Sequence, residues 1–217
     1  MQIIAIASQK GGSGKTTLAG HLAVAAQTAG AGPVVLIDID PQGSLTDWWN
    51  LRQSTTPLFA RATAGRLAAG IDRIRELGVK LLIIDTPPAI TGAIVDAIGL
   101  ADFVLVPARP SPHDLRAAGA TVEIVERLGK PMAFVVNAAT PRAKITNEAL
   151  QALAAHAPIA PVVLHHRTTF AASMIDGRTV MEDPGDERAA TEITQLWEYV
   201  AGRLAKIAGG KEEPCAA

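Results

Sequence analysis

A glycine-rich segment, Gln9–Thr17 (QKGGSGKTT), follows the apolar run Ile3–Ala7 and precedes a helical pattern. A strand, a glycine turn and a helix in this order are what a phosphate-binding loop requires. Glycines let backbone N–H groups converge on phosphate oxygens, and the helix N-terminus adds the positive end of its dipole. In such a loop Lys15 reaches the β- and γ-phosphates and the Thr16 hydroxyl binds Mg²⁺. The segment predicts ATP and Mg²⁺ as ligands, and a glycine turn without a ligand is the alternative.

Two carboxylates follow the apolar run Val34–Ile37 in the segment DIDPQG, as Asp38 and Asp40. Carboxylates two residues apart face the same site only if the strand twists or ends there. Pro41 and Gly43 supply such an ending. Taken alone, the Asp-x-Asp pair is weak evidence, because turns are rich in aspartate.

A third carboxylate, Asp85, ends the apolar run Leu81–Ile84. A buried strand whose last carboxylate emerges beside Mg²⁺ is typical of a Walker B element. Because Mg²⁺ keeps several of its waters, we expect Asp85 to act through one of them. A capping aspartate after a core strand is the alternative.

Together these segments resemble the motifs of the ParA/MinD superfamily, whose deviant Walker A loop reads KGGxGKTT. Gln9 stands where the general P-loop pattern has its first glycine, and a second lysine, Lys10, follows it. The resemblance implies that Lys10 reaches across a nucleotide sandwich dimer to the partner's phosphates and acts with Lys15 in catalysis; a solvated lysine is the alternative. It also implies that Asp40 positions or activates the attacking water and that Asp38 supports the Mg²⁺ site. The implied phosphate-binding set is Lys10, Gly11, Gly12, Ser13, Gly14, Lys15, Thr16 and Thr17, and the implied metal set is Thr16, Asp38 and Asp85.

Short apolar runs alternate with helical patterns along the chain, which predicts parallel strands joined by right-handed crossovers. We expect an α/β fold of the P-loop NTPase type: a single doubly wound, mostly parallel sheet with helices on both faces. The domain should span residues 1–208, with a frayed tail at 209–217. The predicted strands are Ile3–Ala7, Val34–Ile37, Leu81–Ile84, Phe103–Val106, Phe134–Val136 and Pro161–Leu164. The predicted helices include Thr16–Ala29, Arg66–Leu77, Leu115–Leu128, Ile145–Ala155 and Glu187–Ile207.

The resemblance covers nearly the whole chain and is strongest to small ParA-type partition ATPases that lack an N-terminal helix-turn-helix domain. Since the sequence begins directly with the strand before the loop, we expect no operator-specific repression. Asn137 stands where members of the family contact adenine, and a strand-end cap is the alternative. Relatives place basic residues late in the chain against the DNA backbone, which makes Arg167, Arg178 and Lys206 candidates. Such contacts with phosphates give affinity without sequence preference, and surface salt bridges are the alternative for each residue.

Charge and residue content argue against several other classes of protein function. The formal net charge of −1 argues against a chain wrapped throughout by nucleic acid, but it allows a local basic patch. Cys215 is the only cysteine, so a disulfide framework or a cysteine-ligated cluster cannot form within one chain. No Glu or Cys stands at helical or CxxC spacing from His113, His165 or His166, so we expect these histidines to be structural. With no signal peptide and no membrane-length apolar run, we expect a cytoplasmic protein.

The function that the resemblance implies is a slow, partner-stimulated ATPase for segregating or positioning a plasmid, a chromosome or a large protein cargo. Its partners would be a second copy of itself, nonspecific DNA, and a ParB-like or ParG-like stimulating protein or cargo adaptor. It would associate with the nucleoid when ATP is bound. A MinD-like membrane-cycling ATPase is the alternative, disfavoured because GGKEEP near the end of the chain makes a poor amphipathic helix. A cluster-carrying relative would need cysteine ligands, and a P-loop ligase would lack the Lys10 and DxDPQ motifs.

Overall fold

The computed structural model describes residues 1–62, 64–89, 91–183 and 185–210. All six strands lie parallel in one sheet with the order β3-β2-β4-β1-β5-β6. The strands are β1 (Gln2–Ile6), β2 (Val34–Asp38), β3 (Leu58–Ala60), β4 (Leu81–Asp85), β5 (Phe103–Ala108) and β6 (Met132–Val136). The expected single parallel α/β sheet is confirmed, with β1 at its centre.

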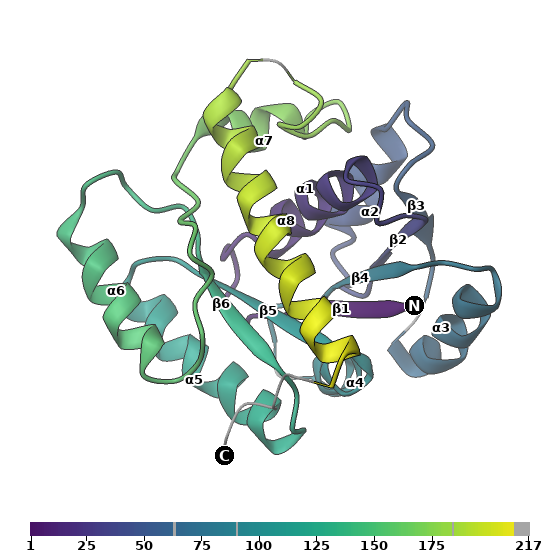
Figure 1. Ribbon diagram of the computed structural model, residues 1–217, viewed down its shortest axis with the longest axis horizontal. Coiled ribbons are helices and arrows are strands. Elements are labelled where there is room, and N and C mark those ends of the chain that lie inside the picture. The colour runs from purple at the N-terminus through teal and green to yellow at the C-terminus, as the bar shows by residue number, and fades with distance from the viewer. Residues whose placement is uncertain (63, 90, 184, 211–217) are drawn as a thin grey trace.

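Helices cover both faces of this sheet (Figure 1). One face packs against α1 (Lys15–Thr28), α2 (Ser44–Leu51), α7 (Thr168–Ser173) and α8 (Glu187–Ala208). The other packs against η1 (Ala64–Arg66), α3 (Leu67–Glu76), α4 (Gly92–Leu100), α5 (Pro112–Arg127) and α6 (Lys144–Ala154). Because both faces are covered, the strands are apolar throughout rather than alternating.

The last helix, α8, runs from beside α7 to the start of β1 (Figure 1). Near its end the backbone carbonyl of Leu204 accepts a 2.8 Å hydrogen bond from the side chain of Gln2. An apolar stripe of this helix is buried against the sheet: Ile193, Leu196, Trp197, Val200 and Leu204. The helix therefore serves as a cover for the sheet. No helix within the described ranges is long and apolar enough to cross a membrane.

The prediction of a strand at Pro161–Leu164 is wrong. Beside β6 the chain makes only two isolated bridges, from Ile159 to Phe134 and from His165 to Ala139. The amides of Ala160 and Leu164 donate to the carbonyls of Phe134 and Val136 on β6. The two donors are four residues apart, whereas the two acceptors are only two residues apart. A ladder cannot continue over that mismatch, and Pro161 also lacks a donor. Residues 211–217 of the predicted tail, with Cys215, lie outside the described residues.

Candidate nucleotide-binding site

The glycine loop connects β1 to α1 at the carboxyl edge of the sheet, with β4 on one side of β1 and β5 on the other. Gly14 caps α1 with a φ of 95°, a backbone conformation that residues with a Cβ rarely adopt. A Cβ there would also collide with Nδ2 of Asn137. The first turn of α1 carries no acidic residue of its own, so nothing within the helix offsets the positive end of its dipole. The loop is shaped to receive an anion.

Lys15 is buried beneath this loop. Its Nζ donates a 3.3 Å hydrogen bond to the backbone carbonyl of Lys10. Burial lowers the pKa of Lys15, while the nearby carboxylates of Asp85 and Asp40 raise it in part. The hydroxyl of Ser13 is buried as well and has no hydrogen-bond partner among the described residues. Phosphate oxygens would accept a hydrogen bond from the Ser13 hydroxyl and would place negative charge beside the Lys15 ammonium.

Asp85 ends β4 beside the loop, and its Oδ2 accepts a 2.7 Å hydrogen bond from the Thr16 hydroxyl. Burial raises the pKa of Asp85 to about 7; the bond from Thr16 lowers it and the charge of Asp38 raises it. The other oxygen, Oδ1, is buried without a partner in the described part of the chain. A hydroxyl and a carboxylate with an unpartnered oxygen are suitable ligands for Mg²⁺. The residues present therefore fit the metal that the sequence implies.

Asp38 lies next to Asp85 in the parallel register of β2 and β4. Its Oδ1 accepts a 3.0 Å bond from the amide of Asp40. Its Oδ2 accepts bonds of 2.9 and 3.1 Å from the amide and hydroxyl of Thr46, in the first turn of α2. Asp40 is half-buried, and its own Oδ1 accepts a 3.0 Å bond from the amide of Gln42. Asp38 thus fixes the turn that carries Asp40 and the start of α2.

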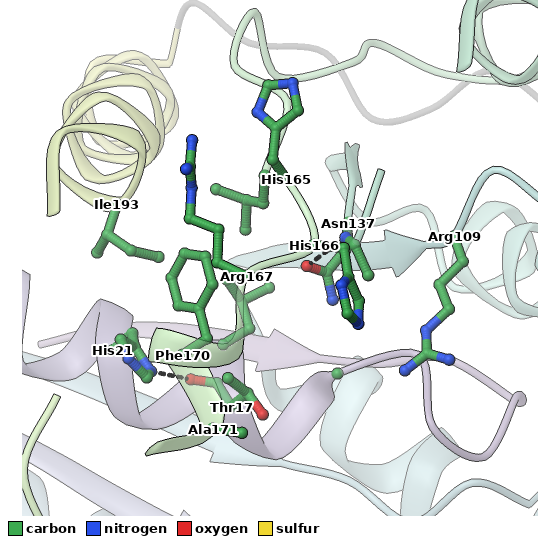
Figure 2. A pocket seen from close by; sticks show the side chains of 14 residues that line it. Thr17, His21, Arg109, Asn137, His165, His166, Arg167, Phe170, Ala171 and Ile193 are labelled. Carbon is green, nitrogen blue, oxygen red and sulfur yellow. Dashed lines mark hydrogen bonds between the residues drawn. The ribbon is translucent and has the colours of Figure 1, made fainter. Parts of the chain in front are cut away.

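A cavity of about 160 Å³ lies beside the loop (Figure 2). One wall consists of Gly14 and Thr17, and Asn137 lies next to them. The Asn137 Nδ2 donates a 2.7 Å bond to the Ser13 carbonyl, and its Oδ1 accepts from the Ala138 amide. In this structure Asn137 braces the glycine loop from the edge of the cavity. The opposite wall includes Leu164, His165, His166, Arg167, Phe170 and Ile193.

Sequence reasoning missed Arg109 and His21, which also line this cavity. Arg109 directly follows β5, the strand next to β1, so its position at the carboxyl edge could have indicated it. Figure 2 shows its side chain beside Asn137 and His166. His21 is fully buried in α1, with its Nδ1 2.8 Å from the Thr17 carbonyl, and no sequence signal separated it from a core residue.

The three predicted DNA-contact residues lie at separate places. Arg167 pairs with Glu192 at 2.7 Å, and Arg178 pairs with Asp176 at 2.9 Å and is half-exposed. Lys206 is exposed near the end of α8, fourteen residues beyond Glu192, or about 21 Å along the helix. Among the described residues, no group of three or more His, Cys, Asp or Glu side chains could hold a metal ion.

A parallel α/β sheet with a glycine loop after its central strand, and an aspartate at the end of the neighbouring strand, defines a P-loop nucleotide-binding protein. The family described as the CobQ/CobB/MinD/ParA nucleotide binding domain matches residues 4–180. The chain belongs to this family, and we treat it as a ParA/MinD-type ATPase.

Two relatives are similar over most of this chain. Maintenance of carboxysome distribution protein A from Halothiobacillus neapolitanus is 28% identical over 91% of this chain and 95% of its own length. Protein ParA from Rhizobium radiobacter is 27% identical over 88% of this chain and 80% of its own. Among solved structures, an ATP complex of Cyanothece McdA has a TM-score of 0.77 at 22% identity, covering 93% of this chain and 96% of that one. The MinC:MinD cell division protein complex of Aquifex aeolicus has a TM-score of 0.78 at 18% identity, and the match covers 93% of this chain and 96% of that one.

Proposed function

We propose that this protein is a positioning ATPase that forms an ATP-dependent sandwich dimer and binds DNA of any sequence. A partner protein would stimulate hydrolysis and thereby release it. The observation that carries the proposal is the contrast between the two lysines of the loop. Lys15 is buried and turned into its own loop, whereas Lys10 is exposed, and no carboxylate within the described residues pairs with it. Lys10 is therefore available to the phosphates held by a second copy.

Each residue of the site has a role in this scheme. Lys15 and the loop amides hold the β- and γ-phosphates, and Thr16 and Asp85 hold Mg²⁺, with Asp38 supporting them. When bound, Mg²⁺ supplies positive charge that offsets the charge of the phosphates. Asp40 positions the attacking water, and Asn137 contacts the base while bracing the loop. Because Asp38 binds both the Asp40 turn and Thr46, a change at the phosphates is transmitted to α2.

The names of the relatives support a role in positioning. They include carboxysome distribution proteins, ParA, and the chromosome-partitioning ATPase Soj of Thermus thermophilus. We infer a cytoplasmic protein that is nucleoid-associated when ATP is bound, with a ParB-like or ParG-like partner or cargo adaptor. Exposed cations such as Arg178 and Lys206 would contact DNA phosphates. The cargo is a plasmid, a chromosome or a large protein body.

The test is retention of DNA by the wild-type protein with ATP, with ADP and without nucleotide. We expect retention only with ATP, equal for unrelated sequences, and falling linearly on a log–log plot against salt. Absence of ATP-dependent retention at low salt would contradict the proposal. ATP-dependent binding to anionic lipid vesicles in place of DNA would favour a membrane-cycling ATPase instead.

A further inference from the structure

Glu192 on α8 is a buried carboxylate that binds the segment 165–167. Its Oε2 accepts a 3.0 Å hydrogen bond from the backbone amide of His165. Its Oε1 lies 2.8 Å from Nδ1 of His165 and accepts a 2.7 Å bond from the guanidinium of Arg167. One side chain from the last helix therefore holds both ends of this short segment.

The contact between Arg167 and Glu192 is largely shielded from water. The side chain of Glu192 is 11% exposed and that of Arg167 is 22% exposed. The Nε of Arg167 is buried and has no partner in the described part of the chain. Glu192 holds Nη2 of Arg167 and offsets its charge, so a DNA phosphate that approached the remaining donors would meet little net positive charge, with a buried carboxylate behind it. This arrangement indicates a role other than DNA contact.

The opposite side of the same segment is fixed to the end of β6. The Leu164 amide donates a 2.9 Å bond to the Val136 carbonyl, and the Leu164 carbonyl accepts a 3.0 Å bond from the Ala139 amide. The His166 amide donates to the Ala139 carbonyl at 2.9 Å. The segment is thus held between β6 on one side and α8 on the other.

This doubly held segment forms a wall of the cavity beside the glycine loop. Figure 2 shows Arg167 extending along that wall beside Ile193 and Phe170, across the cavity from Thr17. A nucleotide with its phosphates at the glycine loop would extend its base into the adjacent cavity, next to Thr17 and Asn137. A wall that is already fixed reduces the ordering cost of binding that base.

We propose that Arg167 and Glu192 are positioning residues for the nucleotide base, with no direct contact to DNA. Glu192 fixes Arg167 and the backbone at His165, and the segment in turn fixes the base of ATP against the cavity. The inference rests on the nucleotide site and does not depend on the proposed DNA binding.

The test compares ligands with and without a base. The affinities of Arg167→Gln and Glu192→Gln for Mg-ATP and for magnesium tripolyphosphate are measured by titration calorimetry. Loss of one charged hydrogen bond at the wall should weaken ATP binding by about tenfold. The affinity for tripolyphosphate should stay unchanged, because the glycine loop is intact. The control is Arg75→Gln, which removes an exposed arginine paired with Asp72 on α3, on the other face of the sheet; both affinities should be those of the wild type.

Two results would overturn the inference. Equal weakening of ATP and tripolyphosphate would mean that the pair only supports the fold. Unchanged ATP affinity with loss of ATP-dependent DNA retention would make Arg167 a DNA contact. If the glutamine variants fail to fold, Arg167→Lys takes their place, because it keeps the charge but not the fork-shaped donor. Its affinities for Mg-ATP and for magnesium tripolyphosphate are then compared in the same way. Because the readout is nucleotide binding, a wild-type protein that retains no DNA would refute the proposed function and leave this inference standing.

Discussion

The hydroxyl of Thr16 donates a 2.7 Å hydrogen bond to Oδ2 of Asp85, which joins the first turn of α1 to the end of β4. The two residues are 69 positions apart in sequence and meet because β1 and β4 are neighbours in the parallel sheet. The bond from Thr16 serves Oδ2 alone, because the buried Oδ1 of Asp85 has no hydrogen-bond partner within the described residues. The site is therefore preorganised for a cation before any nucleotide binds.

Lys15→Ala should abolish ATP binding, because it removes the buried ammonium that faces the phosphate site. Calorimetry with Mg-ATP measures the effect. The matched control is Lys10→Ala, which removes an exposed ammonium of the same loop and should leave the affinity of the monomer for ATP close to that of the wild type. Micromolar ATP affinity in Lys15→Ala would refute the P-loop assignment.

Asp40→Ala should bind ATP but fail to hydrolyse it, because Asp40 is proposed to orient the attacking water. Phosphate release over time, with and without DNA, measures turnover. The dimer should accumulate in this variant, since release requires hydrolysis. Turnover at the wild-type rate would show that Asp40 only stabilises its own turn through Gln42.

Arg52→Ala should lower the free energy of unfolding by about 2 kcal/mol, because the hydrogen bonds of the buried guanidinium to Glu182 and to the Gly177 carbonyl are lost. The Arg52 side chain is 2% exposed, and its guanidinium binds both carboxylate oxygens of Glu182 and the carbonyl of Gly177. Urea unfolding gives the value. Arg75→Ala, which breaks an exposed pair with Asp72, should change it by less than about 0.5 kcal/mol. Equal effects of the two substitutions would show that Arg52 gains nothing from its burial.

The positions of the candidate site residues were largely predictable, because they follow local rules. Lys15 and Thr16 are placed by the turn between a strand and a helix, and Asp38 and Asp85 by the ends of strands that happen to be neighbours. Glycines at positions 30, 78 and 129 follow α1, α3 and α5, and all three have the positive φ that is common just beyond a helix end.

The residues that could not be predicted depend on contacts between distant segments. Arg52 meets Glu182 across 130 residues, and Arg167 meets Glu192 only because α8 folds back over the sheet. The edge strand β3 has three residues with Leu58 exposed, so it carries no run long enough to detect. The predicted strand at Pro161–Leu164 looked apolar and branched, and its failure came from register with β6, which a single sequence does not show.

Protonation of His21 should make the protein less stable in acid. Burial lowers the pKa of His21 to about 4, against 6.5 in the unfolded chain. Between these values the unfolded state binds a proton that the folded state excludes, so the free energy of unfolding falls as pH drops from 6.5 to 4. The total loss from this group is roughly 3 kcal/mol.

Urea unfolding at a series of pH values measures this effect, with His21→Gln as the control. The carboxylates also titrate in this window, but they are common to both proteins, so the difference isolates the histidine. The variant should show a shallower decline between pH 6.5 and 4. Parallel curves for the two proteins would contradict the assignment of a neutral, buried His21.

The central claim is that ATP joins two copies through Lys10. Sedimentation velocity with Mg-ATP tests it most directly, using Asp40→Ala to prevent hydrolysis and comparing it with the double variant that also carries Lys10→Ala. The account predicts that Asp40→Ala is a dimer with ATP and a monomer with ADP. The double variant should be a monomer under both conditions, although it still binds ATP. A monomer for Asp40→Ala with saturating ATP, or a dimer that persists without Lys10, would contradict the account.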